Sequence, residues 1–94
     1  MNVGLLTIGF HLAGCRSLKE KRQRLKGIRD RFGKPLNVAV CESDYQDVHQ
    51  RAQWTFIATA SSASVVEKAL AEIVRSVQIS VDAELIDVHR ERLV

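Results

Sequence analysis

The sequence predicts an α+β fold of the ferredoxin-like type, with the order β-α-β-β-α-β in one domain over residues 1–94. Four segments alternate apolar and polar residues as strands do, and two segments repeat apolar residues at helical spacing. Each helical segment also contains a serine followed three residues later by glutamate, which is a capping-box pattern. A chain of 94 residues, 46% hydrophobic and 27% charged, is typical of one globular core.

The first half of the chain predicts a strand and a helix. Residues 3–12 alternate, so one face of the strand carries Leu6, Ile8, Phe10 and Leu12. After a turn at 13–16, Ser17 and Glu20 predict a capping box that opens a helix. Gly33 predicts a left-handed cap at its end near residue 32, and Pro35 blocks continuation. The apolar stripe of this helix consists of Leu18, Leu25, Ile28 and Phe32.

The second half supplies three strands and a helix. Residues 35–42 predict the second strand, 43–50 a polar connection, and 51–60 the third strand. Ser64 and Glu67 predict the second capping box, which opens a helix. The stripe of this helix consists of Val66, Leu70, Ile73 and Val77. Residues 79–89 predict the fourth strand, and we expect the tail at 90–94 to fray.

Right-handed crossovers then fix the sheet. We expect a four-stranded antiparallel sheet in the order 4-1-3-2, with both helices on one face. The other face would be open and only mildly polar, formed by Leu5, Thr7, Gly9, His11, Asn37, Ala39, Cys41, Thr55, Ile57 and Thr59.

One lysine in the first helix is out of place. Lys21 lies three residues after Leu18 and seven before Ile28, so it points along the apolar stripe. It can lay its methylenes on the core and raise its ammonium toward carboxylates at that end of the sheet. Glu42 is the predicted partner, because its side chain leaves the second strand on the helix side. Structural pairing with Glu42 and contact with a ligand are the two interpretations.

The basic charge is concentrated in this helix. Residues 16–34 contain nine Lys and Arg against two acidic residues, a balance of +7 within a total of +3, so the remainder carries −4. Such segregation is typical of polyanion-binding proteins, although lysine and arginine also suit a merely solvated helix. The candidate phosphate contacts are Arg16, Lys19, Lys21, Arg22, Lys26, Arg29 and Arg51.

Three motifs resemble the bacterial YlxP-like family, a domain of unknown function. They are "SLKEKR" (17–22), "NVAVCE" (37–42) and "DVHQRA" (47–52), in an order and length that cover nearly the whole chain. The resemblance implies a ferredoxin-like, cytoplasmic protein often encoded beside translation-initiation and ribosome-maturation genes, with no established enzyme activity. Family members usually carry an aromatic residue where this chain has His49, and here Trp54 follows five residues later.

The sequence predicts a non-enzymatic protein with no cofactor and no metal site. It has no CxxC, its histidines share no ligand spacing, and the turn after the first strand has only Gly14 to cradle an acyl phosphate. No apolar run approaches the roughly 20 residues of a membrane span. Two cysteines form no disulfide framework, so we expect a cytoplasmic protein.

The function expected first is that of an RNA- or ribosome-associated accessory protein, which binds the phosphate backbone of structured RNA through the basic helix. Recognition by stacking on the open face is not expected, because that face lacks aromatic side chains. The alternative is a homo-oligomeric protein-interaction domain, for instance a homodimer, without nucleic-acid binding.

Overall fold

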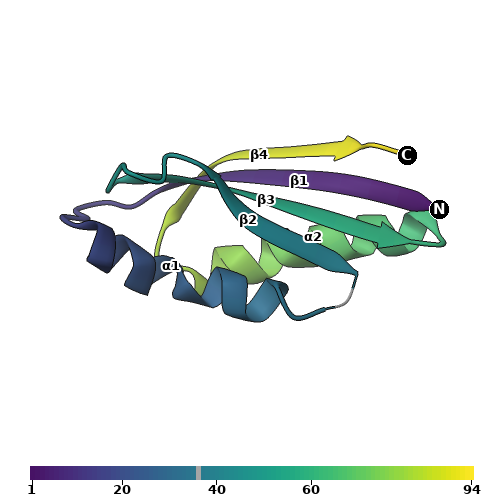
Figure 1. Cartoon of the computed structure of the whole chain (residues 1–94), viewed down its shortest axis with the longest axis horizontal. Helices are drawn as coiled ribbons and strands as arrows, with labels where there is room; N and C mark the ends of the chain where they lie inside the picture. The colour runs from purple at the N-terminus through teal and green to yellow at the C-terminus, as the bar shows by residue number, and fades with distance from the viewer. Residues whose placement is uncertain (36) are drawn as a thin grey trace.

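The computed structural model describes residues 1–35 and 37–94, and its order of elements is the ferredoxin-like one. The chain forms β1 (Asn2–His11), α1 (Leu18–Phe32), β2 (Val38–Asp44), β3 (Arg51–Ala60), α2 (Ala63–Ser80) and β4 (Glu84–Arg92). The antiparallel sheet has the order β2-β3-β1-β4, which is the predicted order read in reverse. Both helices cover one face of it, as Figure 1 shows. The fold prediction is therefore confirmed.

The core lies between the sheet and the two helices. The predicted strand face, the α2 stripe and most of the α1 stripe meet there, with Phe10, Phe56 and Ile28 fully buried. Leu18 of the predicted α1 stripe is only partly buried and lies outside this core. The edge of the Phe32 ring packs against Phe56, with the ring centroids 5.8 Å apart. The burial of these side chains fixes the register of the strands, because a shift of one residue would turn each apolar face to solvent.

The last strand differs from the prediction at both ends. α2 continues to Ser80, so β4 begins at Glu84 rather than at residue 79. The expected fraying of the tail is wrong, since Leu93 donates its backbone N–H to the Val3 carbonyl at 2.8 Å. Val3 in turn donates to Val94 at 3.2 Å. Because β1 begins at Asn2, its first residues provide backbone hydrogen-bond partners for the tail. The short apolar sequence of the tail does not by itself predict this pairing.

The two capping boxes have different outcomes. Ser17 Oγ accepts the Glu20 N–H at 3.0 Å, so the first cap is confirmed. The second prediction is wrong, because α2 begins at Ala63 with Ser62 as its N-cap and without a side-chain capping bond. Ser64 lies in the first turn, where its Oγ is 2.9 Å from that of Ser62. Several neighbouring serines have the same capping chemistry, so their spacing alone could not show which of them is the N-cap of α2.

The predicted left-handed conformation of Gly33 is also wrong. Its φ of −85° and ψ of −7° are right-handed, and its N–H donates to the Arg29 carbonyl at 2.9 Å. Glycine is needed there for space, since a Cβ would lie 2.7 Å from that same carbonyl oxygen. The segment after it includes residue 36 of the predicted second strand, which lies outside the described residues.

Two glycine substitutions in this region are expected to have opposite effects. Gly33→Ala should lower the free energy of unfolding by about 1–3 kcal/mol, because the added methyl overpacks against the Arg29 carbonyl. Gly27→Ala should raise it by up to about 1 kcal/mol, because alanine favours a helix interior and its Cβ would meet no atom within 4 Å apart from the adjacent residues and backbone of α1. Urea denaturation of both variants checks this, and a stable Gly33→Ala would contradict the steric explanation.

Candidate functional site

Lys21 is buried at the start of α1, with 2% of its surface exposed. Its Nζ lies 3.0 Å from Glu42 Oε2, the partner that the sequence predicts. The ammonium also donates to the backbone carbonyls of Tyr45 at 2.6 Å and Val48 at 2.9 Å. These three acceptors use the three donors of the ammonium, so Lys21 ties α1 to β2 and to the connection that follows β2.

This geometry corrects one predicted role. Lys21 is not available as a phosphate contact, because it is buried and its donors already have partners. The lysine instead holds a connection in which Tyr45 takes a positive φ of 62°, an uncommon conformation for a non-glycine residue. The Tyr45 N–H also donates to Asp44 Oδ1 at 2.7 Å. The misplaced charge therefore fixes the shape of the β2–β3 connection.

The sequence did not reveal that the backbone carbonyls of Tyr45 and Val48 accept hydrogen bonds from Lys21. The three N–H groups of a lysine ammonium point in different directions, so one carboxylate rarely accepts from all of them. A buried ammonium therefore needs further acceptors nearby. The residues just after Glu42 were the closest source in the predicted topology. That reasoning indicates the connection but not which carbonyls turn inward, since turning them depends on the conformation of Tyr45.

One flank of α1 is engaged in the fold. Arg24 donates to the carbonyls of Asp82 and Ala13, both at 2.9 Å, and it lies 3.5 Å from the Glu20 carboxylate. Arg31 donates to Ser76 Oγ at 3.0 Å and to Ser80 Oγ at 2.9 Å, so it connects the two helices. The positive charge on this flank therefore stabilises loops and the contact with α2.

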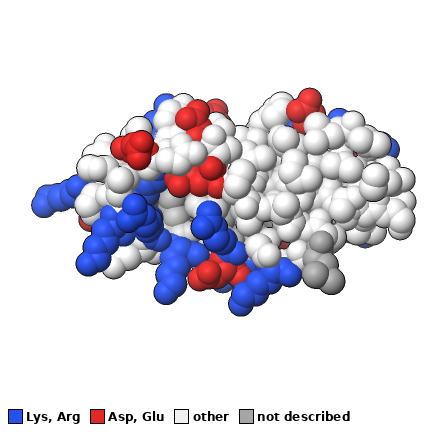
Figure 2. Space-filling model, in the orientation of Figure 1, with Lys and Arg blue, Asp and Glu red and all other residues white. Residues whose placement is uncertain are grey.

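The opposite flank, which we call the basic flank, is exposed. It consists of Lys19, Arg22, Lys26 and Arg29. Within residues 1–35 and 37–94 none of these four side chains forms an ion pair. Figure 2 shows Lys and Arg gathered over α1 on this face of the molecule. The structure thus separates two flanks that are both basic in sequence, one engaged in the fold and one exposed.

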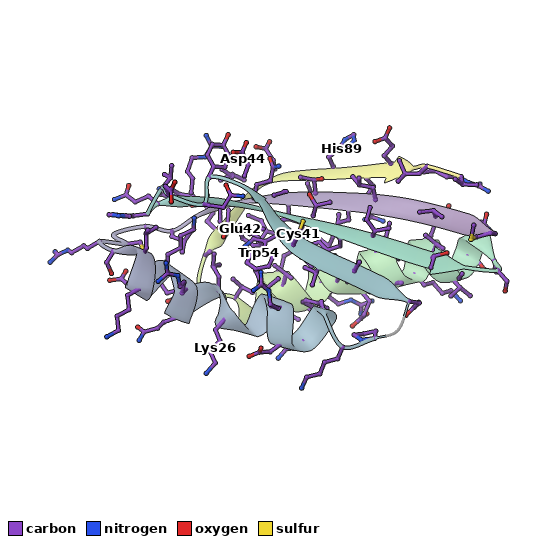
Figure 3. All side chains as sticks on the ribbon, in the orientation of Figure 1. Lys26, Cys41, Glu42, Asp44, Trp54 and His89 are labelled. Carbon is purple, nitrogen blue, oxygen red and sulfur yellow. The ribbon has the colours of Figure 1, made fainter. Side chains whose placement is uncertain are left out.

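A groove of 590 Å³ runs beside the basic flank, between α1 and the ends of β2 and β3. Glu42 and Trp54 are cross-strand partners on the helix side of the sheet, and both line the groove. Figure 3 shows these two side chains between the sheet and α1, with Lys26 pointing away from the sheet. The guanidinium carbon of Arg29 lies 5.7 Å from the centroid of the Trp54 ring. The groove therefore has an aromatic and acidic floor and a basic rim.

The remaining candidates lie elsewhere. Arg16 is exposed in the turn before α1 and does not line the groove. Arg51 alternates along β3 with the buried Ala52 and so faces away from the helices. Its guanidinium stacks on Tyr45, 4.4 Å from the ring centroid. The structure therefore does not bring Arg51 together with the basic flank.

Comparisons with known proteins give a family but no activity. The profile of the family described as "Protein of unknown function (DUF503)" matches residues 3–90. The "Uncharacterized protein YlxP" of Bacillus subtilis (strain 168) is 41% identical over 71 residues, which are 70% of this chain and 77% of that protein. The solved structure of the structural-genomics protein YJCS has a TM-score of 0.60 over 97% of this chain and 98% of its own, at 9% identity. That last similarity concerns the fold alone. Among the described residues, neither helix has the length and hydropathy to cross a bilayer.

Proposed function

The chain belongs to the DUF503 family of proteins of unknown function, and we propose that it is a cytoplasmic accessory protein that binds structured RNA. The contact would be made by the basic flank of α1 with the phosphate backbone, and ribosomal RNA is the RNA we expect. In this proposal the protein positions or protects RNA and catalyses no reaction.

The exposure of the basic flank carries this proposal. Arg24 and Arg31 show that this chain uses basic side chains of α1 for internal contacts where it needs them. The four side chains of the basic flank form no ion pair within the described residues, and the one contact of Arg29, with the face of the Trp54 ring, leaves its charge without a counter-ion. Unpaired cations of one sign repel one another, so keeping four along one flank favours an anionic partner.

The dimensions of the flank suit a nucleic-acid strand. Lys19 and Arg29 are ten residues apart, which corresponds to roughly 15 Å along a helix. That length covers several phosphates of one strand, since even in a DNA duplex the phosphates of one strand follow each other at about 3.4 Å along the axis. Since phosphates carry no sequence information, the basic flank alone would recognise RNA by charge and shape.

Crosslinking in living cells tests the proposal. Ultraviolet crosslinking followed by sequencing of the attached RNA should enrich ribosomal RNA over total RNA. Peptide mapping of the same adducts should place them within residues 18–32. Recovery of RNA no greater than from uncrosslinked cells would contradict RNA binding, and adducts restricted to β4 would contradict the assignment to α1.

A second candidate function is self-association through the open face of the sheet. Leu5 and Ile57 are adjacent in the register of β1 and β3, and no helix covers them within the described residues. Thr7 and Thr55 beside them bond to each other at 3.3 Å, so much of their polarity is satisfied. An oligomer formed by this face should persist as salt rises, because apolar burial is not screened. Light scattering at low and high salt checks this, and a monomeric mass at both would exclude it.

A further inference from the structure

We propose that β4 pairs with the β4 of a second copy of this chain, so that two sheets join edge to edge across a twofold axis at Val88. This inference does not depend on RNA binding, and it uses a different surface from the open face of the sheet. β4 is the last strand in the order β2-β3-β1-β4, so one of its sides has no neighbouring strand among residues 1–35 and 37–94. Such an edge presents a row of unpaired N–H and C=O groups that another strand can bind.

The hydrogen bonds between β4 and β1 determine which backbone groups of β4 face outward. Just after β4, Leu93 donates its N–H to the Val3 carbonyl at 2.8 Å. The register with β1 is regular from Asp87 to Arg92, and successive residues of a strand point their N–H and C=O groups to alternate sides. The backbone groups of Val88 therefore point away from β1. An axis at Val88 would let this residue exchange two hydrogen bonds with its own copy.

The side chains on either side of this axis are complementary. Residues at equal distances from Val88 lie opposite one another, so Asp87 would face His89 of the second copy. The imidazole can donate to the carboxylate in its neutral and in its protonated form. Within its own chain, His89 Nε2 lies 3.8 Å from Glu91 Oε2, which is too long for a hydrogen bond. Val88 itself is 46% exposed and would be covered by its copy.

Other positions of the twofold axis are less favourable. An axis at Asp87, Arg90 or Glu91 would set a charged side chain against its own copy. An axis at His89 would set Asp87 against Glu91 of the second copy, and like charges directly opposite each other destabilise a strand pair. β2, the other edge strand, has only acidic residues among its charged side chains, so it has no comparable register.

The pairing is expected to be short and reversible. The register of β4 with β1 shifts between Gly9 and Phe10, which places Ile86 at a β-bulge. Bulges and charged side chains limit edge-to-edge pairing in natural proteins, so regular pairing should stop near Ile86 rather than extend along the whole strand. Small interfaces are typical of transient complexes, and we therefore expect a weak dimer in exchange with the monomer.

A cysteine on the axis tests the register. In a Cys41→Ser background, which removes the exposed native thiol, Val88→Cys should form a disulfide-linked dimer on oxidation by copper phenanthroline, because residue 88 lies opposite itself. Arg90→Cys is the matched control, since two copies of residue 90 would lie farther apart than the roughly 7 Å between Cα atoms that a disulfide allows. Equal cross-linking of the two variants would overturn the register, and no cross-linking of Val88→Cys would overturn the pairing.

Sedimentation equilibrium on the unmodified protein provides a readout that does not depend on a variant. The mean mass should rise from one chain toward two as the concentration is raised, and a monomeric mass up to roughly 1 mM protein would overturn the proposal. Val88→Lys should abolish this rise, because two ammonium groups would meet at the axis. Val65→Lys is the matched control on α2, where Val65 is 48% exposed, and it should leave the rise unchanged. A rise that persists in Val88→Lys would place the interface on another surface and overturn the pairing of β4.

Discussion

Lys21→Met is expected to lower the free energy of unfolding by about 3 kcal/mol, the cost typical of removing one partner from a buried ion pair. Methionine keeps the apolar stem but leaves three acceptors unpaired, namely the Glu42 carboxylate and the carbonyls of Tyr45 and Val48. For a domain of this size, such a loss corresponds to a fall of more than about 10 °C in melting temperature. Thermal and urea denaturation measure it.

Two controls make this result specific. Lys26→Met is the same substitution at an exposed position of α1, and it should change stability by less than about 0.5 kcal/mol. Adding Glu42→Gln to Lys21→Met should recover part of the loss, because it removes the unpaired charge, but not the part due to the two carbonyls. A Lys21→Met variant as stable as its parent would show that the lysine is kept for a ligand rather than for the fold.

Replacing all four residues of the basic flank by glutamine should weaken RNA binding by roughly a hundredfold or more near 0.1 M salt. These side chains are exposed and have no ion-pair partner within residues 1–35 and 37–94, so the melting temperature should remain close to that of the parent. Filter binding with a structured ribosomal RNA fragment measures the affinity. The substituted residues are Lys19, Arg22, Lys26 and Arg29.

A matched variant tests whether position matters or only charge. It removes four positive charges from α2 and β4 by replacing Lys68, Arg75, Arg90 and Arg92 with glutamine. Its net charge equals that of the first variant, and its affinity for RNA should fall much less. Equal losses in the two variants would indicate a general charge effect, and unchanged binding in the first would favour the self-associating alternative.

The fold could be predicted because local pattern and topology agree. Each strand and each helix has one apolar face, which follows from its alternation or its stripe. Under the right-handed crossover rule these faces can pack together in a single way. The ion pair between Lys21 and Glu42 followed from the same topology, since both side chains had to leave their elements toward the same end of the core.

The parts that sequence did not reveal depend on local conformation. Gly33 is explained by the position of one carbonyl, and the start of α2 by a choice among neighbouring serines. The difference between the engaged and the exposed flank of α1 depends on nearby loops, whose carbonyls at Ala13 and Asp82 accept hydrogen bonds from Arg24. Periodicity describes which residues share a face of a helix, but it does not say which loop lies beside that face.

The salt dependence of RNA binding tests the central claim most directly. If the four cations of the basic flank neutralise phosphates, the logarithm of the association constant should fall with the logarithm of salt concentration at a slope of about −3. The four-glutamine variant should give a slope near zero wherever its binding is measurable. A parent slope near zero, or the same steep slope in both proteins, would contradict binding of RNA by the basic flank of α1.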